Sequence, residues 1–392
     1  MTGRHQNQPP ATPLTATPLA TARRLVVKIG SALLVDSSTG RIRRRWLDAL
    51  IDDIAGLHAH GQQVVIVSSG AIAAGRHQLG LTHRNLRLEE KQAAAATGQI
   101  RLAHAYQDSL NRHQLTVAQI LLSAADTEIR RRHLNARATI QQLLDLGAVP
   151  VINENDSVTT EEIRFGDNDR LGARVAQMIS ADTLLLLSDI DGLYQSDPKT
   201  DPQAAHIPVV TAITPTIEAM AGSAGSDFAS GGMVTKIAAA KIATGAGCQM
   251  AILDGKQLHP IKQLQNAGRA TWFQANGNPG GARKRWIASG LNPQGKIHLD
   301  AGAIGALDRG KSLLPAGVTH VAGDFARGDL VRVINPAGHE VGRGLTAYSA
   351  NDAAKIIGHK SRDIEAILGY RGRDEIIHRD DLVMVAATDE RE

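Results

Sequence analysis

The 392-residue sequence contains a single cysteine, Cys248. One cysteine cannot form a disulfide within the chain, which is typical of a reducing compartment, so we expect a cytoplasmic protein. No apolar stretch approaches the ~20 residues that cross a bilayer, and no membrane association is expected. Residues 1–20 lack the apolar segment of a signal peptide and carry four prolines. We expect them to be a disordered lead-in.

Sequence patterns of metal centres and of hydrolases are also missing. The 15 histidines include no His-Glu-x-x-His, and no Ser–His–Asp arrangement stands out. Residues 189–192 have the Asp-x-Asp-Gly spacing of a calcium loop, but the glutamate that closes such a loop is absent. We therefore expect no metal ion held by protein ligands alone.

The net charge of +4 raises the question of nucleic-acid binding. From residue 295 onward, however, 15 Asp and Glu stand against 13 Lys and Arg. The basic excess lies upstream, partly in residues 41–45, and such a run is usually a solvated helix start.

Up to about residue 260, short runs of Val, Ile and Leu alternate with longer helical patterns. The expected strands are 25–29, 64–67, 117–122, 149–152, 183–187 and 250–253, and the expected helices are 44–60, 88–111, 128–146, 169–179 and 232–245. Most of the strands are apolar throughout, as in strands covered on both faces. The order predicts an α/β domain at 21–282 with a mostly parallel sheet sandwiched between helices.

After residues 277–281 the composition changes to Gly and Ala with short apolar runs at 330–334 and 382–385. We expect a linker at 283–294, a small and mainly β domain at 295–385 with one helix near 351–357, and a tail at 386–392.

Two strand ends carry unusual residues. Lys28 lies inside the first apolar run, and a buried ammonium group is costly unless it meets an anion; the alternative is a lysine that snorkels from the strand edge. Ser69 and Gly70 follow the second strand and precede a helical pattern. Free N–H groups at such a turn suit a carboxylate or phosphate, although Ser69 could equally be an ordinary N-cap.

Asn and Asp are concentrated in residues 153–157 and 166–170. These residues commonly form turns, but two such clusters around a short loop are better explained by an amino-acid site. Carboxylates would hold the ammonium group and amides the carboxylates.

A phosphate cradle is indicated by the Gly-Gly turn at 231–232, which opens a helix with Lys236 one turn in. It is not a Walker A motif. Lys28 and Lys236 together suit phosphoryl transfer to a carboxylate, an acceptor that is ionised at neutral pH and needs no general base. Asp169 is the natural candidate to hold both ammonium groups.

Taken together, these segments resemble the amino-acid kinase family, and within it the kinases that phosphorylate glutamate. The matching stretches are VVKIGS (26–31), VIVSSGAIAAG (65–75), PVINENDSV (150–158), GDND (166–169), LLLLSDIDGLY (184–194), SGGMVTK (230–236) and RKRWI (283–287). The resemblance covers about residues 22–385, and the last hundred residues look like a PUA domain.

The resemblance implies transfer of the γ-phosphoryl group of ATP to the side-chain carboxylate of L-glutamate, the first step of proline synthesis. It implies transition-state roles for Lys28, Asp169 and Lys236, and glutamate contacts at Ser69, Asp156 and Asn168. The implied ATP contacts are Lys28, Ser188, Asp189, Ser230, Gly231, Gly232, Met233, Val234, Thr235 and Lys236. It further implies Mg²⁺ bound through the nucleotide phosphates and water, inhibition by proline at the glutamate site, and a homodimer or homotetramer.

Two rival interpretations stay open. A related kinase could use N-acetylglutamate or aspartate, although the paired Asn/Asp clusters and the C-terminal domain argue against it. An RNA-binding protein is the second, since PUA domains often contact RNA. The acidic balance after residue 295 and the presence there of only three aromatic residues, Phe325, Tyr348 and Tyr370, disfavour it.

Overall fold

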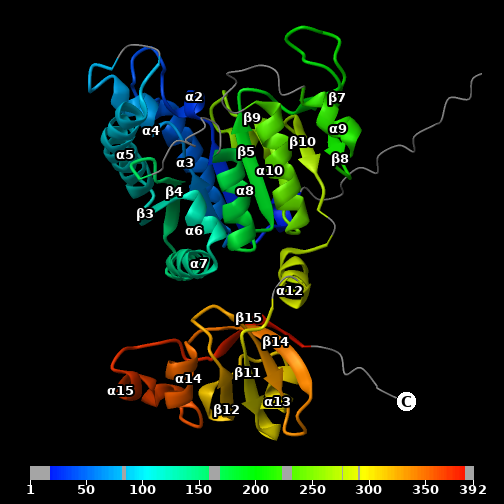
Figure 1. Ribbon diagram of the computed structural model, residues 1–392. Helices are drawn as coiled ribbons and strands as arrows, with labels where there is room; N and C mark the ends of the chain where they lie inside the picture. The colour runs from blue at the N-terminus through cyan, green and yellow to red at the C-terminus, as the bar shows by residue number, and fades with distance from the viewer. Residues whose placement is uncertain are drawn as a thin grey trace, which may run out of the picture. The chain divides into compact units, whose positions relative to one another are not determined.

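The computed structural model describes residues 18–81, 85–158, 168–222, 232–275, 277–289 and 292–384. Two compact units are distinguished (Figure 1). The first holds the described residues up to 128 and those from 136 to 275, and the second holds 129–135 and those from 277 on. None of the described helices is both long and apolar enough to cross a membrane.

An eight-stranded sheet forms the centre of the first unit, in the order β3-β4-β2-β1-β5-β9-β10-β8. Its strands are β1 (Arg24–Ile29), β2 (Gln63–Val67), β3 (Val117–Leu122), β4 (Val149–Glu154), β5 (Thr183–Ser188), β8 (Val209–Val210), β9 (Gln249–Asp254) and β10 (Ala270–Phe273). Neighbouring strands are parallel except β9 and β10, which are antiparallel. The mostly parallel sheet is confirmed, and β6 (Leu193–Tyr194) and β7 (His206–Ile207) form a separate small ribbon.

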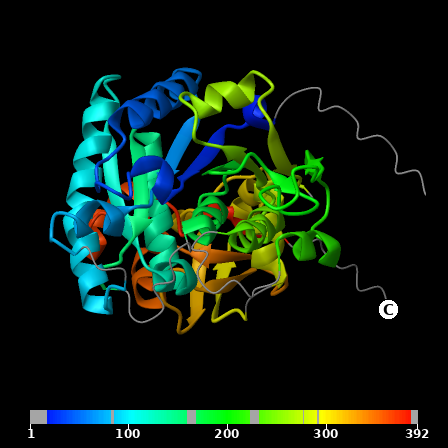
Figure 2. The ribbon, with the colours of Figure 1, turned by 90° about the horizontal axis from the view of Figure 1, so that it is seen from above.

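Helices cover both faces of this sheet (Figure 2). Alternate residues of β1 accordingly belong to two different apolar cores. Leu25 and Val27 belong to one apolar core, whereas Val26 belongs to the other. The first core includes α3 (Arg44–Ala59), α5 (Leu88–Asn111) and α11 (Pro260–Gln265), and the second includes α7 (Arg130–Asp145), α8 (Asn168–Met178) and α10 (Met233–Gly245). Shorter helices are α1 (Pro18–Thr21), α2 (Ser31–Leu34), α4 (Ala71–Arg76), α6 (Ala124–Glu128) and α9 (Pro215–Met220).

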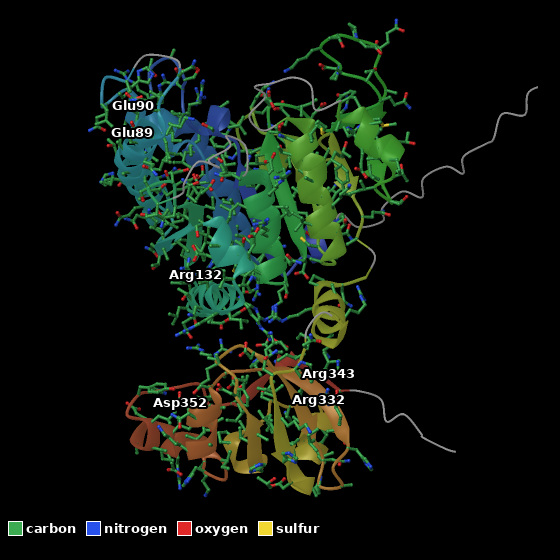
Figure 3. The ribbon with its side chains drawn as sticks, in the orientation of Figure 1. Glu89, Glu90, Arg132, Arg332, Arg343 and Asp352 are labelled. Carbon is green, nitrogen blue, oxygen red and sulfur yellow. The ribbon has the colours of Figure 1, made fainter. Side chains whose placement is uncertain are left out.

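The second unit contains a five-stranded sheet in the order β12-β11-β13-β14-β15. Its strands are β11 (Gly295–Leu299), β12 (Val318–Gly323), β13 (Leu330–Ile334), β14 (Glu340–Thr346) and β15 (Ile377–Met384). Arg332 and Arg343 are opposite each other on β13 and β14 (Figure 3), and both pair with Glu340. This carboxylate offsets part of the positive charge on that face.

The expectation of one helix in the C-terminal part was wrong. Within the expected domain at 295–385, α13 (Ala301–Asp308) and α15 (Ile364–Leu368) lie beside α14 (Ala350–Ile356), and α12 (Pro279–Ser289) precedes that domain. Asp300 starts α13 by accepting a hydrogen bond from the Ala303 N–H. Most residues of α13 are Gly or Ala, so its sequence shows little apolar periodicity. The first part of the expected linker lies in α12.

Candidate active site

The carboxyl ends of the parallel strands meet at one edge of the first sheet. Lys28 of β1 is flanked by Val67 of β2 and Leu186 of β5. Ser69 and Asp156 follow β2 and β4, and Ser188 ends β5. Ligands of open α/β sheets bind beyond this edge, so the topology brings together several of the predicted residues.

Lys28 and Lys236 contact the same carboxylate. The Lys28 Nζ lies 2.6 Å from Asp169 Oδ1, and the Lys236 Nζ lies 3.3 Å from Asp169 Oδ2. Lys28 is 6% exposed, Lys236 5% and Asp169 0%. The expected anion for the buried Lys28 is therefore Asp169, and the snorkelling alternative was wrong.

Burial and charge oppose each other in this triad. Burial lowers the pKa of Lys28, Asp169 counteracts this effect, and Lys236 lowers the pKa further. Burial alone would raise the pKa of Asp169, but the two ammonium groups outweigh it and the net pKa lies below its usual value. One such pair at ~4 Å is worth about 4 kcal/mol at an effective dielectric near 20. Asp169 is therefore an anion that holds two cations in place.

Helix α10 directs its first turn toward the same carboxylate. Gly232 is the N-cap residue, and the Thr235 hydroxyl lies 3.0 Å from Asp169 Oδ2 and 2.8 Å from the Gly232 carbonyl oxygen. The first N–H groups of a helix have no partner inside the helix, so the turn that begins at Met233 and Val234 can receive a phosphate. Ser230 and Gly231 lie outside the described residues.

Asn168 connects the ends of β2 and β4. Its Nδ2 donates to the Ser68 carbonyl oxygen (2.7 Å), the Ser69 Oγ (2.9 Å) and the Asn153 Oδ1 (3.1 Å). The structure thus brings together Ser69 and Asn168, both of which we expected to contact glutamate. Asn153 is 2% exposed, and sequence reasoning gave it no individual role. A polar residue that directly follows a wholly apolar strand was the available signal.

Ser69 is not the N-cap of the helix that follows it. Gly70 has that position, with φ +94°, and α4 has no side-chain cap. A positive φ of this size favours glycine. The backbone turn therefore depends on Gly70, and the Ser69 hydroxyl accepts a hydrogen bond from Asn168.

The remaining predicted residues lie at the end of β5 or follow β4 and β5 in the chain. Burial raises the pKa of Asp156 to about 6. Among the described residues, no hydrogen bond or ion pair joins Asp156 to Ser69 or Asn168. The Ser188 hydroxyl donates to Asp189 Oδ1 at 3.2 Å. Residues 159–167 lie outside the described residues, and they include the first two positions, 166 and 167, of the second Asn/Asp cluster.

Comparison with known proteins gives matches over both units. Residues 23–254 match the model of the amino acid kinase family, and residues 295–368 match that of the PUA domain. A protein named glutamate 5-kinase from Paramagnetospirillum magneticum is 63% identical over 94% of this chain and 99% of its own length. Another glutamate 5-kinase, from Agrobacterium fabrum, is 59% identical over 95% of this chain and 96% of its own. Among solved structures, the isopentenyl phosphate kinase substrate complex aligns over 64% of this chain and 100% of that chain at 16% identity, with a TM-score of 0.46.

Proposed function

The chain belongs to the amino acid kinase family, and from this premise we propose that it phosphorylates L-glutamate with ATP. The product is L-glutamyl 5-phosphate, and the reaction is the first step of proline biosynthesis. The observation that carries the proposal is the Lys28–Asp169–Lys236 triad beside the pair formed by Ser69 and Asn168. Two cations for a transferring phosphoryl group thus lie next to polar groups for an amino acid.

For this reaction the protein has to align the two substrates and to stabilise the charge on the transferring phosphoryl group. An oxygen of the glutamate side-chain carboxylate attacks the γ-phosphorus, the bond to the bridging β–γ oxygen breaks, and ADP leaves with its electron pair. The carboxylate, with a pKa near ~4.3, is already ionised and needs no general base. Lys28 and Lys236 would stabilise the charge on the transferring group from two directions, while Asp169 holds both side chains in place.

In this proposal the two substrates occupy neighbouring halves of the sheet edge. ATP phosphates lie against Ser188, Asp189 and the first turn of α10. Ser230, Gly231 and Gly232, which precede that turn in the sequence, contribute the remaining phosphate contacts. Glutamate binds beside Ser69 and Asn168, and Asp156, which follows β4, holds its ammonium group.

Mg²⁺ is proposed to arrive with ATP. Among the described residues no group of three His, Cys, Asp or Glu is placed to hold a metal ion, and both oxygens of Asp169 contact ammonium groups. This donor set fits an ion coordinated by phosphate oxygens and water rather than by a protein cage. Bound in this way, Mg²⁺ neutralises charge on the nucleotide phosphates.

Further properties belong to the proposal because the resemblance alone supports them. We expect proline to compete with glutamate, the protein to be a homodimer or homotetramer, and the location to be cytoplasmic. The domain boundaries at 21–282, 283–294 and 295–385 stay predictions.

The decisive experiment measures ADP release with L-glutamate, N-acetylglutamate and L-aspartate as acceptors. We expect turnover with glutamate to exceed the other two by at least ~100-fold, because a site built around buried polar groups rejects a ligand that leaves them unpaired. Lys236→Ala should abolish turnover, whereas Lys241→Ala, an exposed lysine of the same helix paired with Glu218, should not. Faster turnover with N-acetylglutamate or aspartate would contradict the proposal.

A further inference from the structure

Helix α5 supports the amino-acid side of the candidate site from behind. Gln99 and Tyr106 are seven residues apart and so lie on one face of the helix. The Gln99 Oε1 accepts a hydrogen bond from Asn153 Nδ2 at 2.8 Å, and the Tyr106 hydroxyl lies 2.9 Å from the Ser68 Oγ. Tyr106 is fully buried. One helix face therefore contacts the residues at the ends of both β2 and β4.

The side-chain amides of Asn168, Asn153 and Gln99 form a row of hydrogen bonds, in which each amide nitrogen donates to the oxygen of the next amide. Gln99 accepts from the nitrogen of Asn153, and the oxygen of Asn153 accepts from the nitrogen of Asn168. The Asn168 nitrogen also donates to Ser69. No described residue donates a hydrogen bond to the Asn168 Oδ1. An amide oxygen left in this position is an acceptor for the ammonium group of an amino acid.

Helix α5 is held close to the site by a direct contact between its backbone and that of α4, at two glycines. A Cβ on Gly98 would lie 1.8 Å from the Ala71 carbonyl oxygen, and one on Gly75 would lie 1.9 Å from that of Ala94. The backbones of α4 and α5 are thus in direct contact one residue before Gln99. Glu89 and Glu90 lie in the first turn of α5 (Figure 3), where negative charge favours the helix N-terminus.

We propose that Gln99 is a positioning residue for the amino-acid substrate. Its Oε1 fixes the orientation of the Asn153 amide, which in turn makes Asn168 present its oxygen to the ligand. The inference rests on the proposed function of the site. A residue that acts in this way should affect glutamate and leave ATP largely unaffected.

Gln99→Met tests this role, because methionine keeps the length of the side chain and removes the acceptor. We expect the KM for glutamate to rise about 10-fold, in line with the loss of one hydrogen bond to a buried amide, while the KM for ATP changes by less than ~2-fold. Gln99→Glu keeps an acceptor oxygen and carries no donor, so the amide chain cannot reverse. It should restore the KM for glutamate to within ~3-fold of the parent value.

Gln107→Met is the matched control, since Gln107 is an exposed residue of the same helix. It should leave both KM values unchanged. A second readout is the Kd of glutamate for each variant, measured by titration calorimetry in the absence of ATP. An unchanged KM for glutamate in Gln99→Met, or equal losses in the Met and Glu variants, overturns the positioning role alone. A parent enzyme that fails to bind or phosphorylate glutamate overturns the proposed function as well.

Discussion

Asp169 neutralises two buried lysines at once, so its charge matters more than its shape. Asp169→Asn keeps the size of the side chain but removes the anion that aligns Lys28 and Lys236. We expect kcat to fall by about 10²–10³, the range seen when one electrostatic group of an active site is lost. Steady-state kinetics at saturating ATP and glutamate measures the change.

The matched control is Asp108→Asn, which breaks the half-exposed ion pair with Arg44. Such a pair contributes less than ~1 kcal/mol, so both kcat and the thermal midpoint should stay close to the parent values. If Asp169→Asn retained kcat within ~3-fold of the parent, Asp169 would have no role in the transition state.

The raised pKa of Asp156 leads to a pH dependence. Burial raises this pKa to about 6, so the carboxylate that would hold the glutamate ammonium group becomes neutral as the pH falls through about 6. We expect kcat/KM for glutamate to decrease about tenfold per pH unit below that value, because this parameter reports ionisation in the free enzyme. The substrate carboxylate, with a pKa near ~4.3, ionises well below this range.

Asp156→Asn separates this carboxylate from other titrating groups. The variant should have a low kcat/KM for glutamate at every pH and lack the decrease near pH 6. If the same decrease persisted in Asp156→Asn, another group would be responsible for it.

At the residue scale, the sequence revealed residues whose burial is unfavourable without a partner. It did not reveal which side chains meet in the folded protein. A lysine in an apolar strand requires an anion, which pointed to the contact between Lys28 and Asp169. The hydrogen bond between Gln99 and Asn153 joins residues 54 positions apart, and nothing in either neighbourhood indicates it. The alternative that Ser69 is an N-cap was wrong for the same reason, because the φ of Gly70 is a property of the folded turn.

At the scale of elements, the contact between α4 and α5 can be tested directly. Gly98→Ala places a Cβ 1.8 Å from the backbone oxygen of Ala71, so the helices must separate. We expect a loss of roughly 2–4 kcal/mol in the free energy of unfolding, at and above the upper end of typical overpacking. The KM for glutamate should rise as well, because Gln99 moves with α5. Urea unfolding and kinetics measure the two effects.

Gly56→Ala in α3 is the control for this substitution. No atom lies within 4 Å of its added Cβ, and it is inside a helix, so we expect stabilisation by about 0.5–1 kcal/mol. A Gly98→Ala variant as stable as the parent would show that α4 and α5 are not held at this distance.

The long elements were predictable because their signal is local. Six strands and five helices lie within two residues of their predicted bounds, since continuous apolar runs and helical periodicity are read from neighbouring residues. The antiparallel strand β10 has only four residues, and its pairing with β9 depends on contacts that no local pattern encodes. Helix α13 was missed because alanine and glycine carry little periodicity.

At the scale of the molecule, the two units have separate apolar cores. The cores of the first unit lie on the faces of the eight-stranded sheet, whereas Ile297, Val331 and Val333 belong to a core of the second. The change in composition after residue 277 predicted the presence of two parts. Units with separate cores often unfold in separate transitions.

Ligand binding should therefore stabilise one unit and leave the other unchanged. A non-hydrolysable ATP analogue with Mg²⁺ at 100 times its Kd stabilises the unit that binds it by about 2.7 kcal/mol. For a unit of this size the shift in Tm is roughly 5–10 °C. We expect scanning calorimetry to show two transitions, of which only the one from the first unit moves.

Two variants assign the transitions. Lys236→Ala should remove the shift caused by the nucleotide, since it deletes a proposed phosphate contact. Ile297→Ala creates a cavity in the core of the second unit and should lower only the other transition, with a loss of about 2–5 kcal/mol. A single transition that moves in response to both the nucleotide and Ile297→Ala would show that the two units unfold together. The C-terminal unit would then contribute to the free energy of unfolding of the first unit, although the apolar cores of the two units are packed separately.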